Sequence, residues 1–345
     1  KKILALAFQN KAAREMKERL EKKYGIRVKI KTFHALGKEI ICRSGEVREV
    51  ESDSESLIRE IFFHLIQKKE FQKLILDYLE CVCGQEKIMN EKDLIQTEDS
   101  FKEHIESLNG KKVMESLPQQ VERFIKIAKN CSLTPVEITK RLAQEEWSSK
   151  QVAFARMGLK IYEAYEEALN QKNRIDFPDM INQAIVKLKI EPDLCRNEWD
   201  YILIDEYQDI SQQRYELIRL LLERNKKAGL FCVGDDWQSI MSFSGSDLNF
   251  FTNFHRYFPD CLKMFMPVNY RSCHSIVATG QEAIQKNILL KRQIEKKCVA
   301  FNQKKRKIQI FTSMHKDTYF DSYCRQIALH CSRQIEEFLK DPKNS

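Results

Sequence analysis

The chain has 345 residues, more than one typical domain needs and enough for two or three. Hydrophobic residues make up 43% and charged residues 31%, as in ordinary globular proteins. No uninterrupted apolar run reaches the roughly 18 residues of a membrane span. The first residues combine a short apolar strand with a basic helix, which does not fit a signal peptide. We therefore expect a cytoplasmic protein with no membrane partner.

The formal net charge of +8 is unevenly distributed along the chain. Residues 1–50 hold fourteen Lys/Arg against six Asp/Glu, and residues 286–307 hold nine against one. Basic segments of this kind suit a polyanion such as nucleic acid, although solvated lysines on helix faces explain the second segment equally well. The eleven cysteines cannot all pair, and C-x-C at 81–83 is no zinc signature. We expect reduced thiols.

The N-terminal segment predicts a β-α-β unit. Residues 3–8 are short and apolar, as expected of a buried parallel strand, and Asn10 is a favourable N-cap for the helix that follows. Gly25 is expected to end that helix. Its apolar face consists of Ala12, Ala13, Met16 and Leu20. Residues 28–33 form the next predicted strand and lead into another helix, so we expect a right-handed crossover and a parallel sheet.

The pattern changes between about Gly45 and Glu167, where predicted strands vanish and helical periodicity dominates. The length is that of a domain rather than a loop. We expect an all-helical insertion at 46–167. It would interrupt an α/β domain formed by residues 1–45 and 168–258.

A further unit is expected at 259–345. Residues 262–266 predict its first strand and residues 269–272 a turn. A helix and a strand around 308–311 would follow. About eighty residues are few for a full α/β domain, so this unit would be only the start of one.

Two apolar strands of the predicted sheet end in carboxylates. Residues 201–204 precede Asp205 and Glu206, and residues 229–233 precede a segment that includes Gln238. In an open parallel sheet, ligands gather at the carboxyl ends of the strands. Adjacent carboxylates there can hold a hydrated Mg²⁺ and orient a water, and an amide can bond a γ-phosphate. The alternative is a charged surface loop after each strand.

The segment Asn269-Tyr270-Arg271-Ser272 offers complementary chemistry. Tyr270 supplies an aromatic face for a base, and Arg271 supplies a planar cation for phosphate. An arginine from a second domain could stabilise the charge that develops in phosphoryl transfer. The alternative for Tyr270 is a packed hinge residue.

Taken together, these segments resemble the motifs of superfamily 1 DNA helicases of the UvrD/Rep type. The tryptophan at position 237 is similar to the helicase IV group within that family. Six segments match in order over residues 6–272, which makes the resemblance highly specific. They are residues 6–16 (motif Ia), 32–36 (Ib), 176–180 (the segment after the insertion), 204–211 (II), 233–245 (III) and 269–272 (IV).

The resemblance implies a fold of two RecA-like P-loop NTPase domains, 1A and 2A, with ATP between them and single-stranded DNA across their top. The helical insertion would be domain 1B. It also implies a role for each of five residues. Asp205 would serve Mg²⁺, Glu206 would position or deprotonate the attacking water, Gln238 would couple γ-phosphate to DNA, Arg271 would touch the γ-phosphate, and Tyr270 would stack on adenine.

The resemblance further implies a set of DNA-binding residues. The track would be lined by Phe8, Asn10, Thr32, Phe33 and His34, with Trp237 and Phe243 as further candidates. Aromatic side chains at strand ends can stack on bases without sequence preference. Each also has a structural alternative: core packing for Phe8 and Phe33, a helix cap for His34, and a domain interface for Trp237.

The sequence also departs from the family pattern. It contains no Gly-rich loop ending in Gly-Lys-Ser/Thr and no counterpart of motifs V and VI. Near the end of motif III, Met241, Phe243 and Ser244 replace the tyrosine, tryptophan and arginine that are common there. We therefore expect a piece of a longer 3′-to-5′ helicase with little ATPase of its own, because catalytic parts act as a unit.

Two other functions remain open. One is a non-catalytic module that binds DNA or a partner protein. The other is a helicase-like subunit of a helicase–nuclease complex. For the helicase, we expect single-stranded or partly duplex DNA as the partner, with repair or recombination proteins as further candidates.

Overall fold

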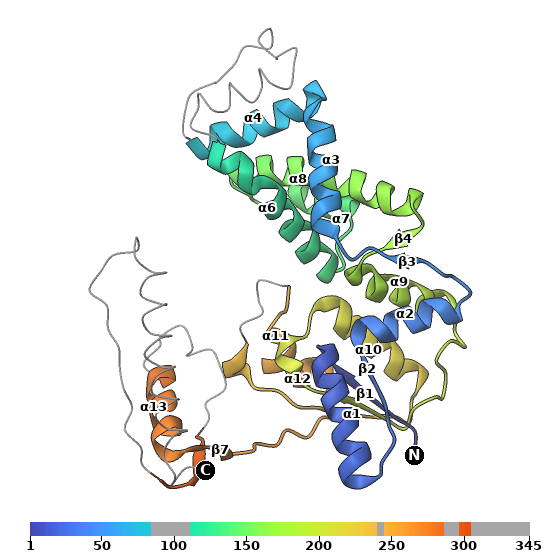
Figure 1. The fold of residues 1–345 in the computed structure, drawn as a ribbon, viewed down its shortest axis with the longest axis vertical. Helices are drawn as coiled ribbons and strands as arrows, with labels where there is room; N and C mark the ends of the chain where they lie inside the picture. The colour runs from blue at the N-terminus through green and yellow to red at the C-terminus, as the bar shows by residue number, and fades with distance from the viewer. Residues whose placement is uncertain (84–110, 240–244, 286–296, 305–345) are drawn as a thin grey trace, which may run out of the picture. The chain divides into compact units, whose positions relative to one another are not determined.

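The computed structural model describes residues 1–83, 111–239, 245–285 and 297–304 (Figure 1). The chain divides into two compact units, residues 1–262 and 263–345. Each is described by itself below. Among the described residues, no helix is both long and apolar enough to cross a bilayer.

A four-stranded sheet forms the centre of the first unit. It contains β1 (Ile3–Ala7), β2 (Lys29–Thr32), β5 (Tyr201–Ile204) and β6 (Gly229–Cys232) in the order β2-β1-β5-β6. Every neighbouring pair is parallel. The sheet confirms the predicted α/β class, and it brings the carboxyl ends of all four strands to one edge.

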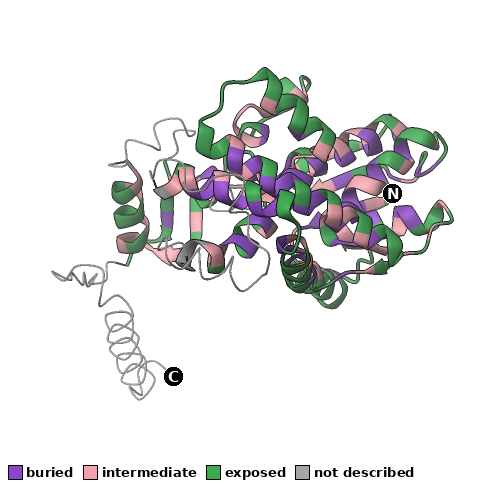
Figure 2. Cartoon of the chain, turned by 90° about the horizontal axis from the view of Figure 1, so that it is seen from above, coloured by how far each residue is buried: buried purple, intermediate pink, exposed green. Residues whose placement is uncertain are grey.

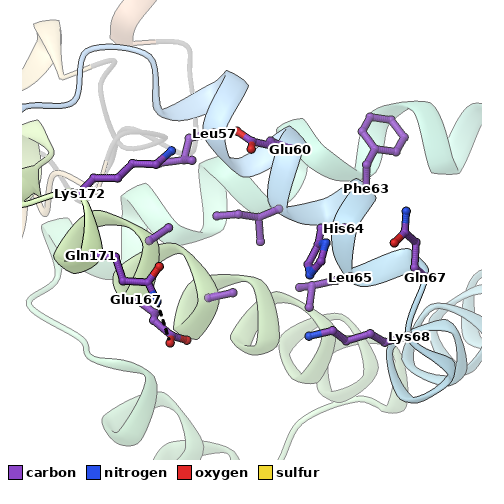
Figure 3. A pocket seen from close by; sticks show the side chains of 13 residues that line it. Leu57, Glu60, Phe63, His64, Leu65, Gln67, Lys68, Glu167, Gln171 and Lys172 are labelled. Atoms are coloured by element: carbon purple, nitrogen blue, oxygen red, sulfur yellow. Dashed lines mark hydrogen bonds between the residues drawn. The ribbon is translucent and has the colours of Figure 1, made fainter.

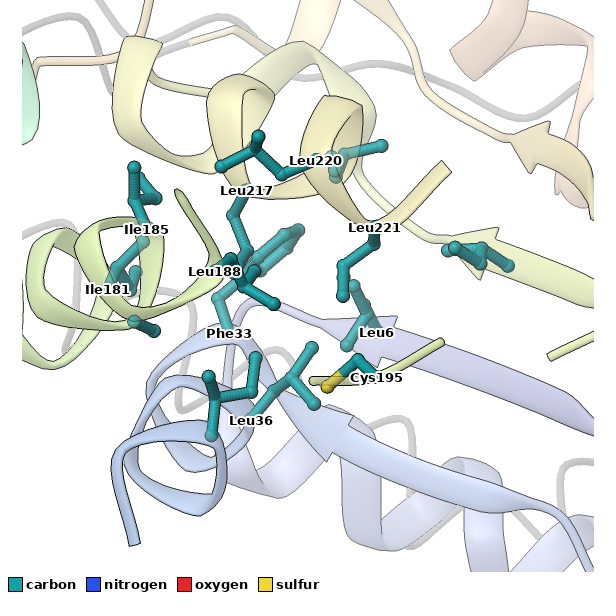
Figure 4. Close-up of a cluster of buried hydrophobic side chains, with 14 of the residues drawn as sticks. Leu6, Phe33, Leu36, Ile181, Ile185, Leu188, Cys195, Leu217, Leu220 and Leu221 are labelled. Atoms are coloured by element: carbon teal, nitrogen blue, oxygen red, sulfur yellow. The ribbon is translucent and has the colours of Figure 1, made fainter. Parts of the chain in front are cut away.

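Four longer helices accompany this sheet: α1 (Asn10–Tyr24), α2 (Phe33–Arg43), α9 (Phe177–Ile190) and α10 (Gln212–Arg224). Side chains of α2, α9 and α10 gather with Leu6 of β1 in one hydrophobic core (Figure 4). Leu4 and Leu6, which share one face of β1, and Ala5 on the other face are all at most 2% exposed, as expected of a strand covered on both faces. The buried residues run through the sheet and the helix faces turned toward it (Figure 2).

Helix α1 differs from the prediction at its start. Gln9, in extended conformation, occupies the N-cap position, and its side chain makes no capping hydrogen bond. The prediction that Asn10 caps the helix is therefore wrong, because β1 ends at Ala7 and the helix already includes Asn10. Gly25 ends the helix with a φ of 65°, as expected of a left-handed C-cap. The predicted apolar face, residues 12, 13, 16 and 20, is only half-buried.

The described part of the segment between α2 and α9 is mostly helical. Its described helices are α3 (Ser54–Ile66), α4 (Lys69–Cys83), α6 (Lys111–Asn130), α7 (Pro135–Gln144) and α8 (Ser149–Gln171). They form a second hydrophobic core of their own, which includes Phe62, Val121 and Tyr165. Thr134 and Ser148 start α7 and α8 with reciprocal capping boxes.

Two short strands join the ends of this helical segment. β3 (Glu49–Val50) pairs in parallel with β4 (Arg174–Ile175). The prediction that strands are absent after Gly45 is therefore wrong at this point. Two residues are too few for a periodic pattern, and the pairing exists only because the fold brings the two ends together.

Short elements complete the first unit. Two 3-10 turns, η2 (Tyr207–Asp209) and η3 (Asp236–Gln238), follow β5 and β6. The short helices α11 (Asn249–Thr252) and α12 (Phe254–Tyr257) come next. Phe250 of α11 is buried and stacks on Tyr215 of α10, with ring centroids 4.8 Å apart.

In the second unit, the structure describes β7 (Val268–Cys273), α13 (His274–Gln285) and β8 (Val299–Asn302). The strands β7 and β8 are parallel. The prediction of a strand at 262–266 is wrong: Leu262, Met264 and Met266 are at least 80% exposed, and pairing begins only at Val268. The predicted strand at 308–311 lies outside the described residues.

Candidate functional site

The candidate site is the edge of the sheet where all four parallel strands end. Leu6 of β1 is in register with Ile204 of β5, and Ile204 is in register with Cys232 of β6. Asp205, directly after β5, donates its backbone N–H to the carbonyl of Leu6 over 3.2 Å. The predicted acidic segment and the predicted amide segment therefore leave the sheet side by side.

The two predicted carboxylates differ in their backbone. Asp205 is half-buried, and its Oδ1 accepts the backbone N–H of Glu206 over 3.0 Å. Glu206 is exposed and has a φ of 53°, in the left-handed region that a residue with a side chain rarely adopts. Such conformations cost of order 1–3 kcal/mol and cluster at functional sites. The left-handed residue marks the turn from β5 into η2.

Gln208 links the loop after β5 to the loop after β6. Its Nε2 donates to Oε2 of Glu206 over 2.6 Å, and its Oε1 accepts the backbone N–H of Asp235 over 2.9 Å. The side chain is only 2% exposed. A Cβ at Gly234 would lie 2.6 Å from the same Gln208 oxygen, so glycine allows this close approach. Sequence reasoning included Gln208 in a motif but gave it no role.

Gln238 joins the same hydrogen-bonded path. Its Nε2 donates to Oδ2 of Asp235 over 2.8 Å, while Oδ1 of Asp235 accepts the backbone N–H of Trp237. A chain of hydrogen bonds thus runs from Glu206 through Gln208 and Asp235 to Gln238. The carboxylate and the amide that were predicted to share one site are connected through two intermediate residues.

The donor set at this edge fits a magnesium ion that takes one carboxylate from the protein and most of its other oxygens from a bound phosphate compound and water. Among the described residues, no group of three or more His, Cys, Asp or Glu side chains could hold a metal ion alone. Mg²⁺ typically binds one or two carboxylates and completes its shell with phosphate oxygens and water. Asp205, half-buried at the end of a strand, is the residue that would hold it.

The aromatic residues predicted to contact DNA lie beside this loop. The ring centroids of Phe8 and Phe33 are 5.2 Å apart. Phe8 is half-buried, but Phe33 is only 1% exposed and belongs to the core. The Phe33 ring packs inside the fold at the start of α2, as the structural alternative expects, and its stacking on a base stays a prediction.

Thr32 and His34 flank Phe33 and also have structural partners. The Thr32 hydroxyl accepts the backbone N–H of Ala35 over 3.2 Å and caps α2. The cap is thus Thr32, not His34. The His34 ring packs edge-on against Phe177, with centroids 5.8 Å apart. Burial, assisted by the charge of Arg214, lowers the pKa of His34 to about 4, so this imidazole is neutral at physiological pH.

The remaining predicted DNA contacts are spread along the edge. Asn10 is exposed at the start of α1, and Trp237 is half-buried in η3. Phe243 lies outside the described residues, as do Met241 and Ser244.

The second unit carries the other two predicted nucleotide contacts on β7. Tyr270 is 72% exposed and lies 5.1 Å, between ring centroids, from Phe301 of β8. Arg271 is also exposed, and its backbone N–H donates to Oδ1 of Asn269 over 3.0 Å. Asn269 also accepts from Ser272, so the predicted turn is a local kink within β7.

The comparisons with known proteins agree with this geometry. A family model described as the UvrD/REP helicase N-terminal domain matches residues 1–259. The chain belongs to the UvrD/REP helicase family. It is 30% identical over 292 residues to DNA helicase IV of Escherichia coli (strain K12). The aligned region covers 83% of this chain and 40% of that relative.

Two further relatives have a comparable sequence identity to this chain. ATP-dependent DNA helicase PcrA of Staphylococcus aureus (strain Mu50 / ATCC 700699) is 28% identical over 83% of this chain and 34% of its own length. PcrA of Leuconostoc citreum is 28% identical over 83% of this chain and 33% of its own length. The chain thus spans at most about two fifths of these relatives.

A buried ion cluster, which sequence reasoning missed, joins the helical segment of this UvrD/REP domain to its sheet. Lys129 of α6 is 1% exposed, and its ammonium lies 2.8 Å from Asp176, 2.5 Å from Asp179 and 2.5 Å from Glu166. The Tyr165 hydroxyl donates to Asp176 over 3.1 Å. Burial raises the pKa of Asp179, opposed by Lys129 and reinforced by the other two carboxylates.

The same end of α6 contacts further elements of the sheet domain. Asn130 accepts a hydrogen bond from Gln213 of α10, and the Lys129 carbonyl accepts one from Asn182 of α9 over 2.9 Å. A Cβ at Gly245 would lie 2.9 Å from the Asn130 side chain. No motif includes Lys129 or Asn130, and their ion-pair and hydrogen-bond partners Glu166 to Gln213 are 37 to 83 positions away in sequence.

A cavity of about 620 Å³ lies elsewhere, between α3 and α8 of the helical segment. Figure 3 shows His64 and Lys68 on one of its walls and Glu167 and Gln171 on another. It contains none of the motif residues. We therefore place the candidate site at the sheet edge and not in this cavity.

Proposed function

We propose that this chain is part of an ATP-dependent DNA helicase that translocates 3′-to-5′ on single-stranded DNA. The observation that carries the proposal is the hydrogen-bonded path from Glu206 through Gln208 and Asp235 to Gln238, at the carboxyl edge of a parallel sheet. The half-buried aromatic Phe8 lies at the same edge. Gln238, which follows β6, and Phe8, which follows β1, are thereby carried by ends of the same sheet edge, with the end of β5 between them.

We further propose the domain boundaries of the chain. Residues 1–45 and 168–258 would form RecA-like domain 1A, residues 46–167 domain 1B, and residues 259–345 the start of domain 2A. The separate hydrophobic core of the helical segment supports the first boundary. The division into compact units at residue 262 supports the last.

The chemistry follows from the side chains at the edge. Bound ATP with Mg²⁺ would supply the phosphoryl group and neutralise its charge. Asp205 would hold the ion, and Glu206, exposed beside it, would orient a water and accept its proton. Gln208 would hold the Glu206 carboxylate in place. Gln238 would bond the γ-phosphate by exchanging its hydrogen bond with Asp235.

Arg271 and Tyr270 complete the proposed nucleotide contacts. Arg271 would donate to the γ-phosphate, and Tyr270 would stack on the adenine. Their exposure on β7 supports this proposal, because both side chains are available to a ligand.

We also propose that the 345-residue chain by itself is nearly inactive as an ATPase. The sequence has no Gly-Lys-Ser/Thr loop, whose backbone N–H groups and lysine supply much of the phosphate affinity in such sites. A phosphate-release assay with single-stranded DNA should show no turnover above background. Turnover near that of an intact helicase would contradict the proposal.

A fusion tests the catalytic assignment directly. Joined to a Gly-rich phosphate loop and the missing motifs of a relative, the chain should gain DNA-stimulated ATP hydrolysis and unwind a 3′-tailed duplex. Glu206→Gln should then lower kcat by at least about a hundredfold with little change in KM, since a general base contributes 10²–10⁴. Unchanged kcat in that variant, or unwinding only of 5′-tailed duplex, would refute the assignment.

DNA binding separates this function from a purely protein-binding module. The chain should bind a fluorescein-labelled oligo(dT) at low salt, and the affinity should fall as salt rises. Fluorescence anisotropy measures both. Absence of binding at low salt would favour a scaffold that contacts only a protein partner.

A further inference from the structure

Arg214 of α10 is the common neighbour of the aromatic residues at the candidate DNA edge. Its guanidinium carbon lies 5.1 Å from the Phe8 ring centroid and 5.9 Å from that of Phe33. Its charge also lowers the pKa of His34. Three residues predicted to contact DNA thus surround one arginine that the sequence analysis did not single out.

This arginine supplies positive charge at a place where histidine does not. His34 is neutral at physiological pH because its pKa is about 4. Burial lowers the pKa of Arg214 only to about 10, opposed by the charge of Asp209, so the guanidinium stays charged. Aromatic faces orient a guanidinium and leave its edge for planar hydrogen bonds.

The hydrogen-bonding capacity of Arg214 is not used up inside the protein. Nη1 donates to the hydroxyl of Ser211 over a long 3.4 Å, and Nε is buried with no acceptor among the described residues. The described part of the chain shows no ion pair to this side chain. By contrast, Arg219, one helical turn and a half further along α10, donates to both Glu216 and Glu223.

We propose that Arg214 is a DNA-binding residue that donates hydrogen bonds to a backbone phosphate of a single strand passing over Phe8. This inference rests on the proposed function, since it requires the edge to bind DNA. A charged, half-buried and incompletely paired guanidinium on an aromatic pair is preorganised for a phosphate. The Phe8 ring would stack on a base while Arg214 fixes the strand.

The salt dependence of binding tests this role. For single strands the logarithm of the association constant falls with the logarithm of salt concentration by about 0.7 for each phosphate contacted. In the 345-residue chain, Arg214→Gln should make the slope shallower by about 0.7 and weaken oligo(dT) binding roughly fivefold to tenfold at 50 mM salt. Arg214→Lys should keep the wild-type slope, because it keeps the charge.

Arg219→Met is the matched control on the same helix and should leave slope and affinity unchanged. The slope does not depend on the fraction of protein that is folded, so partial unfolding of a variant does not mimic the effect. If the wild type binds and Arg214→Gln has the wild-type slope, the role of Arg214 is refuted while the proposed function stands. If the wild type does not bind oligo(dT) at all, the proposed function is contradicted, and the role of Arg214 is contradicted with it.

Discussion

The rings of Phe8 and Phe33 lie 5.2 Å apart at the ends of β1 and β2, yet only Phe8 reaches the surface. The two phenylalanines therefore differ in accessibility although they are in contact. Phe33 belongs to the core of the sheet domain, and Phe8 is only half-buried.

Substituting each residue tests this difference. Phe33→Ala should destabilise the chain by about 3–5 kcal/mol, as for other buried phenylalanines. Phe8→Ala should cost less stability but weaken oligo(dT) binding by about 1–3 kcal/mol, the worth of one stacked base. Urea unfolding and fluorescence anisotropy give the two quantities. Equal effects of both variants on DNA affinity, after correction for unfolded protein, would contradict this division.

The Lys129 cluster should be a major source of stability. Lys129→Met removes the cation from the buried Asp176 and Asp179 and from the partly exposed Glu166, and should lower the free energy of unfolding by about 3–5 kcal/mol. The control is Lys126→Met, an exposed lysine one turn earlier on the same helix, which should change stability by less than about 0.5 kcal/mol. Similar urea midpoints for the two variants would show that the cluster does not stabilise the junction.

Gln208 should be intolerant of a charge. Gln208→Glu replaces the donor to Glu206 with a second carboxylate at a residue only 2% exposed, and should destabilise by roughly 1–3 kcal/mol. The same substitution at Gln212, exposed in the first turn of α10, should be neutral or slightly stabilising because it complements the helix dipole. Thermal unfolding at neutral pH compares the two. A harmless Gln208→Glu would mean that the link between the two loops is dispensable.

His34 should make stability depend on pH. Its pKa is about 4 in the folded chain against 6.5 in the unfolded one, because burial and the charges of Arg214 and Lys126 oppose protonation more strongly than Asp176 favours it. The unfolded state therefore takes up the proton first as the pH falls. The resulting stability is complete above pH 6.5 and is lost progressively toward pH 4.

The comparison with His34→Gln isolates this contribution. Between pH 7.5 and 4.5 the wild type should lose roughly 2 kcal/mol more than the variant, measured by urea unfolding at both pH values. Parallel pH profiles would show that His34 does not titrate abnormally.

Local sequence patterns predict the α/β fold class and the polar residues that follow its strands. Short apolar runs that end in Asp205 and in the segment of Gln238 are local patterns, and parallel β-α-β topology requires their ends to meet at one edge. The turn at Gly25 is equally local, since few other residues adopt its left-handed conformation at no cost.

The side chains that remain accessible at that edge depend on tertiary packing. Phe8 and Phe33 both follow predicted strands, and only the packing of the core around β1, α2, α9 and α10 leaves Phe8 half-buried and Phe33 buried. Arg214 and Lys129 carry no local signal, because the rings of Phe8 and Phe33 and the buried carboxylates that they contact are distant in sequence. Burial and long-range charge depend on the whole fold, and a residue's own neighbours in sequence do not encode them.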